Sequence, residues 1–161
     1  MFCTEELLKA ARAAYPEMLA VGFIMNEDEI TAALADKHGM IGSDGILFNG
    51  NGHPRAAGTF PRVLGNYVRE KKALSLMEAL KKMTVKPADR LSLNDRGRIA
   101  VGGWADLTIF NPDTIADGAS YDNLRVPPLG IDYVLLAGKV AVEHQKIICD
   151  RLGTFLAFQR G

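Results

Sequence analysis

A glycine-rich stretch, residues 41–62, brings together three side chains that can do chemistry. Asp44 offers a carboxylate, and His53 and Arg55 follow it on either side of a proline. A positioned carboxylate can move a proton during hydrolysis. A guanidinium can hold another carboxylate through two parallel hydrogen bonds. The residue types in this loop are therefore those that acid–base chemistry and anion recognition use.

Taken one at a time, these residues also have structural explanations. An aspartate between Ser43 and Gly45 is most often a turn residue that hydrogen-bonds its own backbone. A histidine before Pro54 fits a packed or surface side chain, and Arg55 alone fits a solvated charge. The loop is no phosphate cradle, because it lacks both G-x-G-x-x-G and a following Lys-Ser or Lys-Thr.

The elements before this loop predict a favourable position for Asp44. Residues 19–25 and 40–42 are short apolar runs, which indicate buried strands, and a helix is expected between them from Asn26. Strand, helix and strand joined this closely predict a right-handed parallel crossover. Asp44 would then follow the carboxyl end of the second strand, the edge where parallel α/β folds bind ligands.

Helix starts carry capping signals. Thr4 precedes two glutamates, and Asn26 and Ser75 each precede a glutamate by three positions. A further helix is predicted around Tyr67 from its apolar spacing, and Lys86-Pro87 is expected to interrupt the helical part.

The second half of the chain has the patterns of strands. Strands are predicted at residues 98–101, 104–110, 131–137 and 139–144. Gly138 marks a tight turn between the last two. The chain therefore divides into an α/β part, residues 1–86, and a β-rich part, residues 87–161. Two parallel strands are too few for a stable sheet covered on both faces, so we expect the α/β part to be incomplete.

Composition and charge argue against several classes of protein. With 19 basic and 19 acidic residues among 161, the chain has no basic excess to bind nucleic acid. No apolar run could span a membrane and the first residues lack a signal pattern, so a cytoplasmic location is predicted. Cys3 and Cys149 are expected to be reduced thiols. The basic run 69–72, with Lys81 and Lys82, is expected to form a solvated helix face.

Several segments together match one family of enzymes. In order, they are I-G-S-D-G, H-P-R, G-T-F-P-R-V-L-G, L-S-L-x-E-A-L-x-K-M-T, P-A-x-R-L, D-R-G-x-I and G-x-x-A-D-L-x-I-F. Residues 21–144 thereby resemble the C-terminal third of the N-acyl-D-amino-acid deacylases, the D-aminoacylase branch of the amidohydrolase superfamily. The resemblance implies an α/β plus β fold. It would be the C-terminal end of a (β/α)8 amidohydrolase barrel followed by strands of a small β-sandwich.

The resemblance also implies roles for the loop residues. Asp44 would lie at the zinc site after the eighth barrel strand, as a metal ligand and as general base and acid. Arg55 would hold the free carboxylate of the substrate, an N-acyl-D-amino acid. Ser43, Gly45 and His53 would be further substrate-binding residues.

The sequence departs from this family in its metal ligands. Its histidines, His38, His53 and His144, form no H-x-H pair, whereas a catalytic zinc site takes three protein ligands. We therefore expect the chain to bind zinc weakly and to be inactive by itself. The prediction is a fragment or subunit of a zinc-dependent amidohydrolase, completed by an upstream barrel segment or a complementary chain.

Two other hypotheses stay open. In the first, the chain is a stand-alone interaction or scaffold domain that keeps a relic of the site and pairs its strand edges in a homo-oligomer. In the second, it is part of a cyclic-amide hydrolase of the dihydroorotase or hydantoinase type. The latter enzymes share the A-D-L motif and an aspartate after the last strand. The S-D-G, H-P-R and G-T-F-P-R motifs favour the deacylases.

Overall fold

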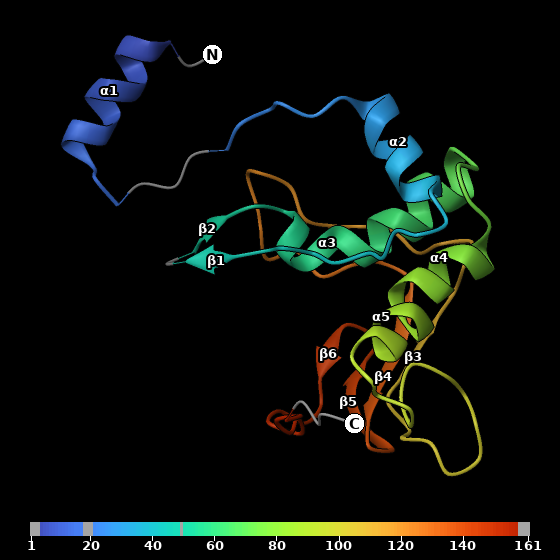
Figure 1. Ribbon diagram of the computed structural model, residues 1–161. Coiled ribbons are helices and arrows are strands. Elements are labelled where there is room, and N and C mark those ends of the chain that lie inside the picture. Colours follow the sequence, from blue (N-terminus) through green and yellow to red (C-terminus); the bar gives the residue numbers. More distant parts are fainter. Residues whose placement is uncertain (1–3, 18–20, 49, 158–161) are drawn as a thin grey trace.

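The computed structural model describes residues 4–17, 21–48 and 50–157. The helices are α1 (Glu5–Ala14), α2 (Glu27–Ala35), α3 (Arg55–Arg62), the π-helix η1 (Val63–Glu70), α4 (Leu76–Met83) and α5 (Val85–Arg90). The strands are β1 (Leu47–Phe48), β2 (Asn51–Gly52), β3 (Leu107–Phe110), β4 (Ile131–Leu136), β5 (Lys139–Glu143) and β6 (Lys146–Ile147). Helices precede the main sheet along the chain, as Figure 1 shows.

Capping residues predict the starts of three helices correctly. Asn26 Oδ1 accepts a hydrogen bond from the Asp28 N–H at 2.8 Å, and Ser75 Oγ accepts one from the Glu78 N–H at 3.2 Å. Thr4 caps α1 in the same way. Each cap satisfies a backbone donor that has no partner within the first helical turn. Helix α1 buries none of its residues and lies apart from the other elements (Figure 1).

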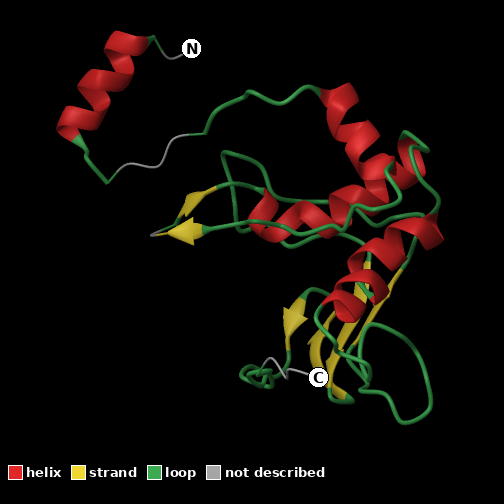
Figure 2. Ribbon diagram, in the orientation of Figure 1, coloured by secondary structure: helices red, strands yellow, loops and turns green. Residues whose placement is uncertain are grey.

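The helix predicted around Tyr67 begins earlier, at Arg55, and widens along its length. Pro61 lies inside α3 and has no N–H, so one α-helical hydrogen bond is missing there. Further on, the Lys71 N–H donates to the Asn66 carbonyl at 2.8 Å, five residues back, as in a π-helix. Helices α3 and η1 follow each other directly and lead away from the loop that precedes Arg55 (Figure 2).

The largest cluster of buried side chains lies where η1 packs against α4. Its buried members are Val63, Leu64, Tyr67, Ala79 and Ile115. Ile115 comes from the long loop after β3, so this core joins the helical part of the chain to the β-rich part. Partly buried residues of α2 and of the segment before Asp44 also pack against it.

The strands predicted at residues 19–25 and 40–42 are wrong wherever the structure describes them. Residues 21–25 form no strand, and Phe23 is 82% exposed; residues 19 and 20 lie outside the described part. In the second segment, the Ile41 N–H donates to the Lys82 carbonyl at 3.1 Å rather than to a strand. A strand needs a neighbouring strand to satisfy its backbone, and the sheets formed by the described residues are all antiparallel.

The β-rich half forms the antiparallel sheet β3-β4-β5-β6. It contains three of the predicted strands, with β3 shorter than expected, and Gly138 makes the predicted turn at a φ of 77°. The strand predicted at residues 98–101 is wrong, because this segment is exposed and pairs with no strand. The β1–β2 hairpin and β6, each with two-residue strands, escaped prediction.

Two expectations about the helical part need correction. Lys86 and Pro87 do not end the helical region but lie in the first turn of α5, where a proline is tolerated. Lys82, expected on a solvated face, is only 1% exposed.

Cys149 is an exposed free thiol, whereas Cys3 lies outside the described residues. None of the described helices is long and apolar enough to cross a bilayer.

Candidate active site

The structure brings Asp44 and Arg55 into direct contact. Arg55 Nη2 lies 2.9 Å from Asp44 Oδ2, and Arg55 Nε donates to the Asp44 carbonyl oxygen at 2.9 Å. The side chains are 88% exposed for Asp44 and 46% for Arg55. An ion pair this exposed contributes little to stability. Both groups therefore remain accessible to a substrate, and the guanidinium keeps further N–H groups that can donate.

Backbone geometry holds Asp44 at the start of α3. Asp44 adopts a φ of 44°, in the left-handed region that aspartate tolerates better than most residues. Gly45 follows, and a β-carbon there would lie 2.4 Å from Ala56 Cα. Only glycine allows this approach, so the S-D-G segment packs directly on the first turn of α3. The Ser43 hydroxyl, rather than the Asp44 carboxylate expected to do so, accepts from the backbone in this turn, at 3.4 Å from the Gly45 N–H.

His53 joins the site through two hydrogen bonds. Its Nδ1 accepts from the Arg55 backbone N–H at 3.1 Å, and its Nε2 lies 2.9 Å from the Tyr121 hydroxyl oxygen. The Tyr121 ring stands edge-on to the imidazole, with 5.2 Å between ring centroids, and a second edge contact joins it to Phe23 at 5.3 Å. Tyr121 was not predicted, because it lies 68 residues from His53 in a loop without a motif.

Electrostatics favour a neutral His53. Burial lowers its pKa from the ordinary value of 6.5, and the nearby positive charge of Arg55 lowers it further. Since Nδ1 accepts a hydrogen bond, the proton of the neutral ring sits on Nε2, which donates to the Tyr121 oxygen. Below its lowered pKa the ring would be protonated on both nitrogens and Nδ1 would lose the Arg55 contact.

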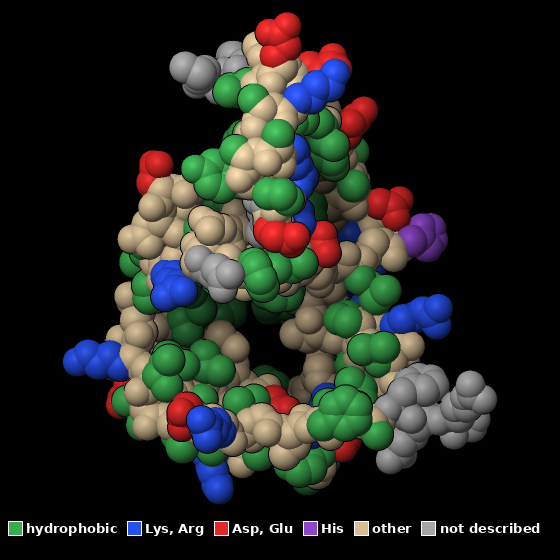
Figure 3. Space-filling view, turned by 90° about the vertical axis from the view of Figure 1, so that its left-hand side faces the viewer, with side chains coloured by type: hydrophobic (Ala, Val, Ile, Leu, Met, Phe, Trp, Pro, Cys, Tyr) green, Lys and Arg blue, Asp and Glu red, His purple; other side chains and the backbone are tan. Residues whose placement is uncertain are grey.

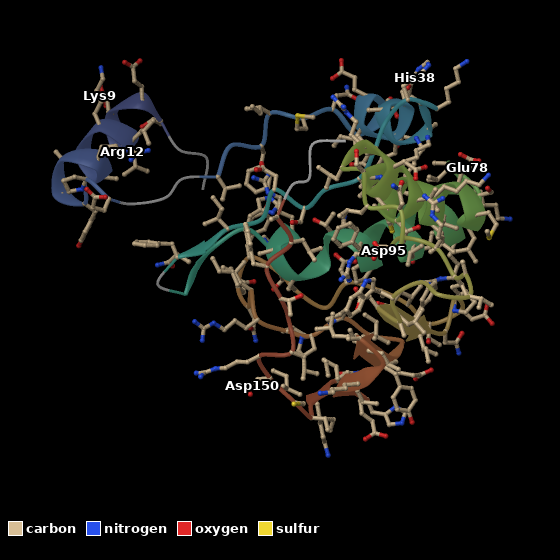
Figure 4. All side chains as sticks on the ribbon, turned by 60° about the horizontal axis from the view of Figure 1, so that its bottom comes forward. Lys9, Arg12, His38, Glu78, Asp95 and Asp150 are labelled. Atoms are coloured by element: carbon tan, nitrogen blue, oxygen red, sulfur yellow. The ribbon has the colours of Figure 1, made fainter. Side chains whose placement is uncertain are left out.

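The described residues do not make a metal centre. Within residues 4–17, 21–48 and 50–157, no three His, Cys, Asp or Glu side chains come together as a metal site. His38 lies at the end of α2, beside Asp36, and is labelled in Figure 4. His144 lies beside Tyr133 of β4. Asp44 therefore belongs to no group of three metal-binding side chains among the described residues.

A separate hollow of about 160 Å³ opens beside Trp104. It is lined by Gly102, Gly103, Trp104, Ala105 and Ala137. None of these side chains can transfer a proton or bind a metal, so the hollow does not compete with the loop as a reaction site.

Sequence comparison gives this geometry a family context. Residues 11–142 match the sequence pattern of the amidohydrolase family. The chain is 43% identical over 133 residues to the N-acyl-D-glutamate deacylase of Alcaligenes xylosoxydans xylosoxydans, covering 83% of this chain and 27% of that protein. It is 38% identical over 138 residues to the D-aminoacylase of the same organism, covering 86% of this chain and 28% of the relative. The chain thus spans little more than a quarter of the length of these relatives.

Solved structures give the same result. An N-acyl-D-glutamate deacylase from Bordetella bronchiseptica, complexed with zinc and a phosphonate inhibitor, superposes with a TM-score of 0.70 at 40% identity. That match covers 73% of this chain and 25% of the other. A crystal structure of D-aminoacylase superposes with a TM-score of 0.81 at 35% identity, covering 91% of this chain and 32% of the other. Both the sequence and the arrangement of elements are shared.

Proposed function

This chain belongs to the amidohydrolase family, and from that premise we propose that it is part of a hydrolase of N-acyl-D-amino acids. The enzyme would cleave the amide bond to give a carboxylate and a D-amino acid. One observation carries the proposal: the guanidinium of Arg55 lies 2.9 Å from the carboxylate of Asp44. A group that binds carboxylates therefore stands beside a group that can carry a proton.

Asp44 carries the proton in the proposed reaction. Its carboxylate takes a proton from the attacking water as the new C–O bond forms at the acyl carbon. The same carboxyl group then gives that proton to the amide nitrogen as the C–N bond breaks, so one side chain serves both steps. The 88% exposure of this side chain leaves it free to reach both atoms.

Arg55 orients the substrate. Its N–H groups hold the free carboxylate of the amino acid through paired hydrogen bonds, which fixes the α-carbon next to Asp44. Fixing the α-carbon in this way is the proposed source of selectivity for the D form. Ser43, Gly45 and His53 shape the pocket around it.

Zinc is the proposed metal of the complete enzyme, where a bound zinc ion would make water a better nucleophile at neutral pH. Asp44 is the residue of this chain that would contribute to holding it. The other ligands are proposed to come from outside the described residues, which lack a set of three.

We further propose that the chain completes a larger fold. Residues 1–86 would form the last strands and helices of a (β/α)8 barrel, and residues 87–161 would add β-sandwich strands. Two observations support this: the chain spans 27% of a relative's length, and the apolar side chains of Phe23 and Ile24 are 82% and 87% exposed. The partner would be an upstream barrel segment or a complementary chain, and the isolated 161 residues would be inactive.

The test uses the natural protein that contains this chain, purified with zinc. We expect hydrolysis of N-acetyl-D-glutamate or N-acetyl-D-alanine, but not of their L forms or of cyclic amides. Asp44→Asn should lower kcat roughly 10²- to 10⁴-fold, the range for loss of an acid–base group. Arg55→Lys should raise KM roughly tenfold to a hundredfold, as for a lost hydrogen bond to a charged group.

Arg12→Lys is the matched control, because Arg12 lies on the separate helix α1 (Figure 4). Hydrolysis of dihydroorotate or a hydantoin instead would assign the chain to the cyclic-amide hydrolases. Activity that survives Asp44→Asn unchanged would show that Asp44 does not carry the proton. Hydrolysis by the isolated 161 residues at enzyme-like rates would disprove the proposal that this chain is inactive by itself.

A further inference from the structure

The loop between β3 and β4 lies along α3 and η1, where it is held by arginines. Arg62 Nη1 lies 3.1 Å from Asp117 Oδ2, and Arg69 Nη1 donates to the Ile115 carbonyl at 2.6 Å. Gly58 permits the contact, because a β-carbon there would lie only 2.8 Å from Asp117 Cβ. The loop, orange in Figure 1, is therefore attached to the helix that begins at the candidate site.

This attachment brings Tyr121 to the site from the β-rich half of the chain. The Nε2–H of His53 donates to the Tyr121 hydroxyl, and the Nδ1 of His53 accepts from the Arg55 backbone N–H. The three residues form one hydrogen-bonded series, at 2.9 Å and 3.1 Å. Phe23 also packs against the Tyr121 ring in an edge-on arrangement. The orientation of the imidazole is thereby fixed at both nitrogens.

We propose that Tyr121 is a positioning residue for Arg55, acting through His53. The proposal rests on the proposed function, in which Arg55 holds the substrate's carboxylate. Arg55 is the first residue of α3, where backbone N–H groups lack helical partners. His53 satisfies the Arg55 N–H only while its ring keeps one orientation. The Tyr121 hydroxyl maintains that orientation, because it is the acceptor that Nε2–H requires.

Removing the Tyr121 hydroxyl should affect KM and kcat differently. Loss of the Tyr121 hydroxyl allows the His53 imidazole to rotate. The Arg55 N–H then loses its hydrogen bond to Nδ1, and the Arg55 guanidinium is held less firmly in position. Recognition of the substrate carboxylate weakens, while Asp44 keeps the carboxylate that transfers the proton. KM should therefore rise without a matching fall in kcat, and only for substrates that have the carboxylate.

Tyr121→Phe in the natural protein removes just the hydroxyl. We expect KM for N-acetyl-D-glutamate to rise roughly twofold to tenfold, the factor for one lost hydrogen bond. The KM of the analogue with an α-carboxamide should stay at the parent value. Tyr133→Phe is the matched control, since Tyr133 also packs beside a histidine, at 5.3 Å from His144, but in the sheet. Equal effects of the two variants would overturn the proposal.

A second variant tests whether Tyr121 acts through His53. Asparagine at position 53 can accept from the Arg55 N–H but is too short to reach Tyr121. In a His53→Asn background, adding Tyr121→Phe should therefore change KM no further. If the two changes instead multiply in KM, Tyr121 acts independently of His53 and the proposal is wrong.

A spectroscopic measurement separates this proposal from the proposed function. In the same protein, Tyr121→Phe should shift the imidazole ¹⁵N resonances of His53 and speed hydrogen exchange of the Arg55 amide, whereas Tyr133→Phe should do neither. If the parent hydrolyses no N-acyl-D-amino acid while these shifts occur, the proposed function fails and the positioning role of Tyr121 stands. If hydrolysis occurs but the resonances of Tyr121→Phe match the parent, the positioning role fails alone.

Discussion

Lys82 is a charged residue inside the protein, held by backbone carbonyl groups. It is 1% exposed, and its Nζ donates to the Leu34 carbonyl at 2.6 Å and also to the Asp36 carbonyl. Both carbonyls lie at the end of α2, where helical acceptors have no N–H partners. The ammonium group therefore caps α2 from α4.

Replacing Lys82 by methionine should destabilise the fold by about 1–3 kcal/mol. Methionine keeps much of the apolar stem but leaves two carbonyl acceptors of partly buried hydrogen bonds without their donor. Lys81→Met is the control, because the neighbouring Lys81 side chain is 55% exposed and pairs with Glu78 on the surface of the same helix. Urea unfolding at neutral pH measures both variants. Equal stabilities of the two would mean that the buried hydrogen bonds of Lys82 contribute nothing.

At the candidate site, sequence-based prediction singled out residues that are near one another in the chain. Asp44 and Arg55 are 11 positions apart and were singled out together; the structure pairs them, while their catalytic roles remain predictions. Tyr121 was missed because its contact depends on how a distant loop docks. No local pattern encodes that docking, which needs a glycine and an arginine on α3 to meet an aspartate more than 50 residues later.

Between elements, Glu27 joins the start of α2 to the end of η1. Its carboxylate is hydrogen-bonded to Lys71, whose Nζ also lies 4.9 Å from the centre of the Tyr67 ring. The hydrogen bond from Lys71, followed by one from Tyr67, lowers the pKa of Glu27 below its ordinary value of 4.5. The folded chain therefore releases this proton at a pH where the unfolded chain still binds it.

The sign of the pH dependence follows from this lowered pKa. Stability from Glu27 is fully present above about pH 4.5 and is lost as the pH falls through the folded pKa. Glu27→Gln should therefore lower the free energy of unfolding at neutral pH, and the difference from the parent should shrink below about pH 4.5. Denaturant unfolding at several pH values measures it.

Glu29→Gln is the control on the same helical turn, because Glu29 makes no ion pair within the described part of the chain. It should show no such convergence with the parent at low pH. A Glu27→Gln difference that stays constant down to acid pH would exclude the Lys71 contact as its cause.

Helices were predicted better than strands, for a physical reason. The N-cap of a helix and its first turn are adjacent in sequence, so Asn26 and Ser75 predict where α2 and α4 begin. A strand is defined by a partner that the sequence does not point to. Residues 21–25 and 40–42 have the composition of strands but pair with no strand among the described residues. By contrast, β4 and β5 pair with each other, because the turn at Gly138 brings them together.

At the scale of the whole molecule, large apolar side chains remain uncovered. Phe23, Ile24 and Met25 are each at least 70% exposed, and Ile46 is 66% exposed. Figure 3 shows hydrophobic side chains spread over one face, around a central hollow. Water contact with this much apolar surface is unfavourable. The surface therefore supports the proposal that further barrel strands cover this part of the chain.

The two halves of the described chain are joined at Gly65, on which the last prediction depends. A β-carbon there would lie 2.6 Å from the Ile115 carbonyl oxygen, the same oxygen that Arg69 binds. Gly65→Ala should therefore push the loop off η1 and destabilise the fold by about 1–3 kcal/mol, the usual cost of overpacking. Gly42→Ala, whose β-carbon meets open space, should change stability little. Thermal unfolding compares the two, and a Gly65→Ala variant as stable as the parent would show that the loop does not need this close contact.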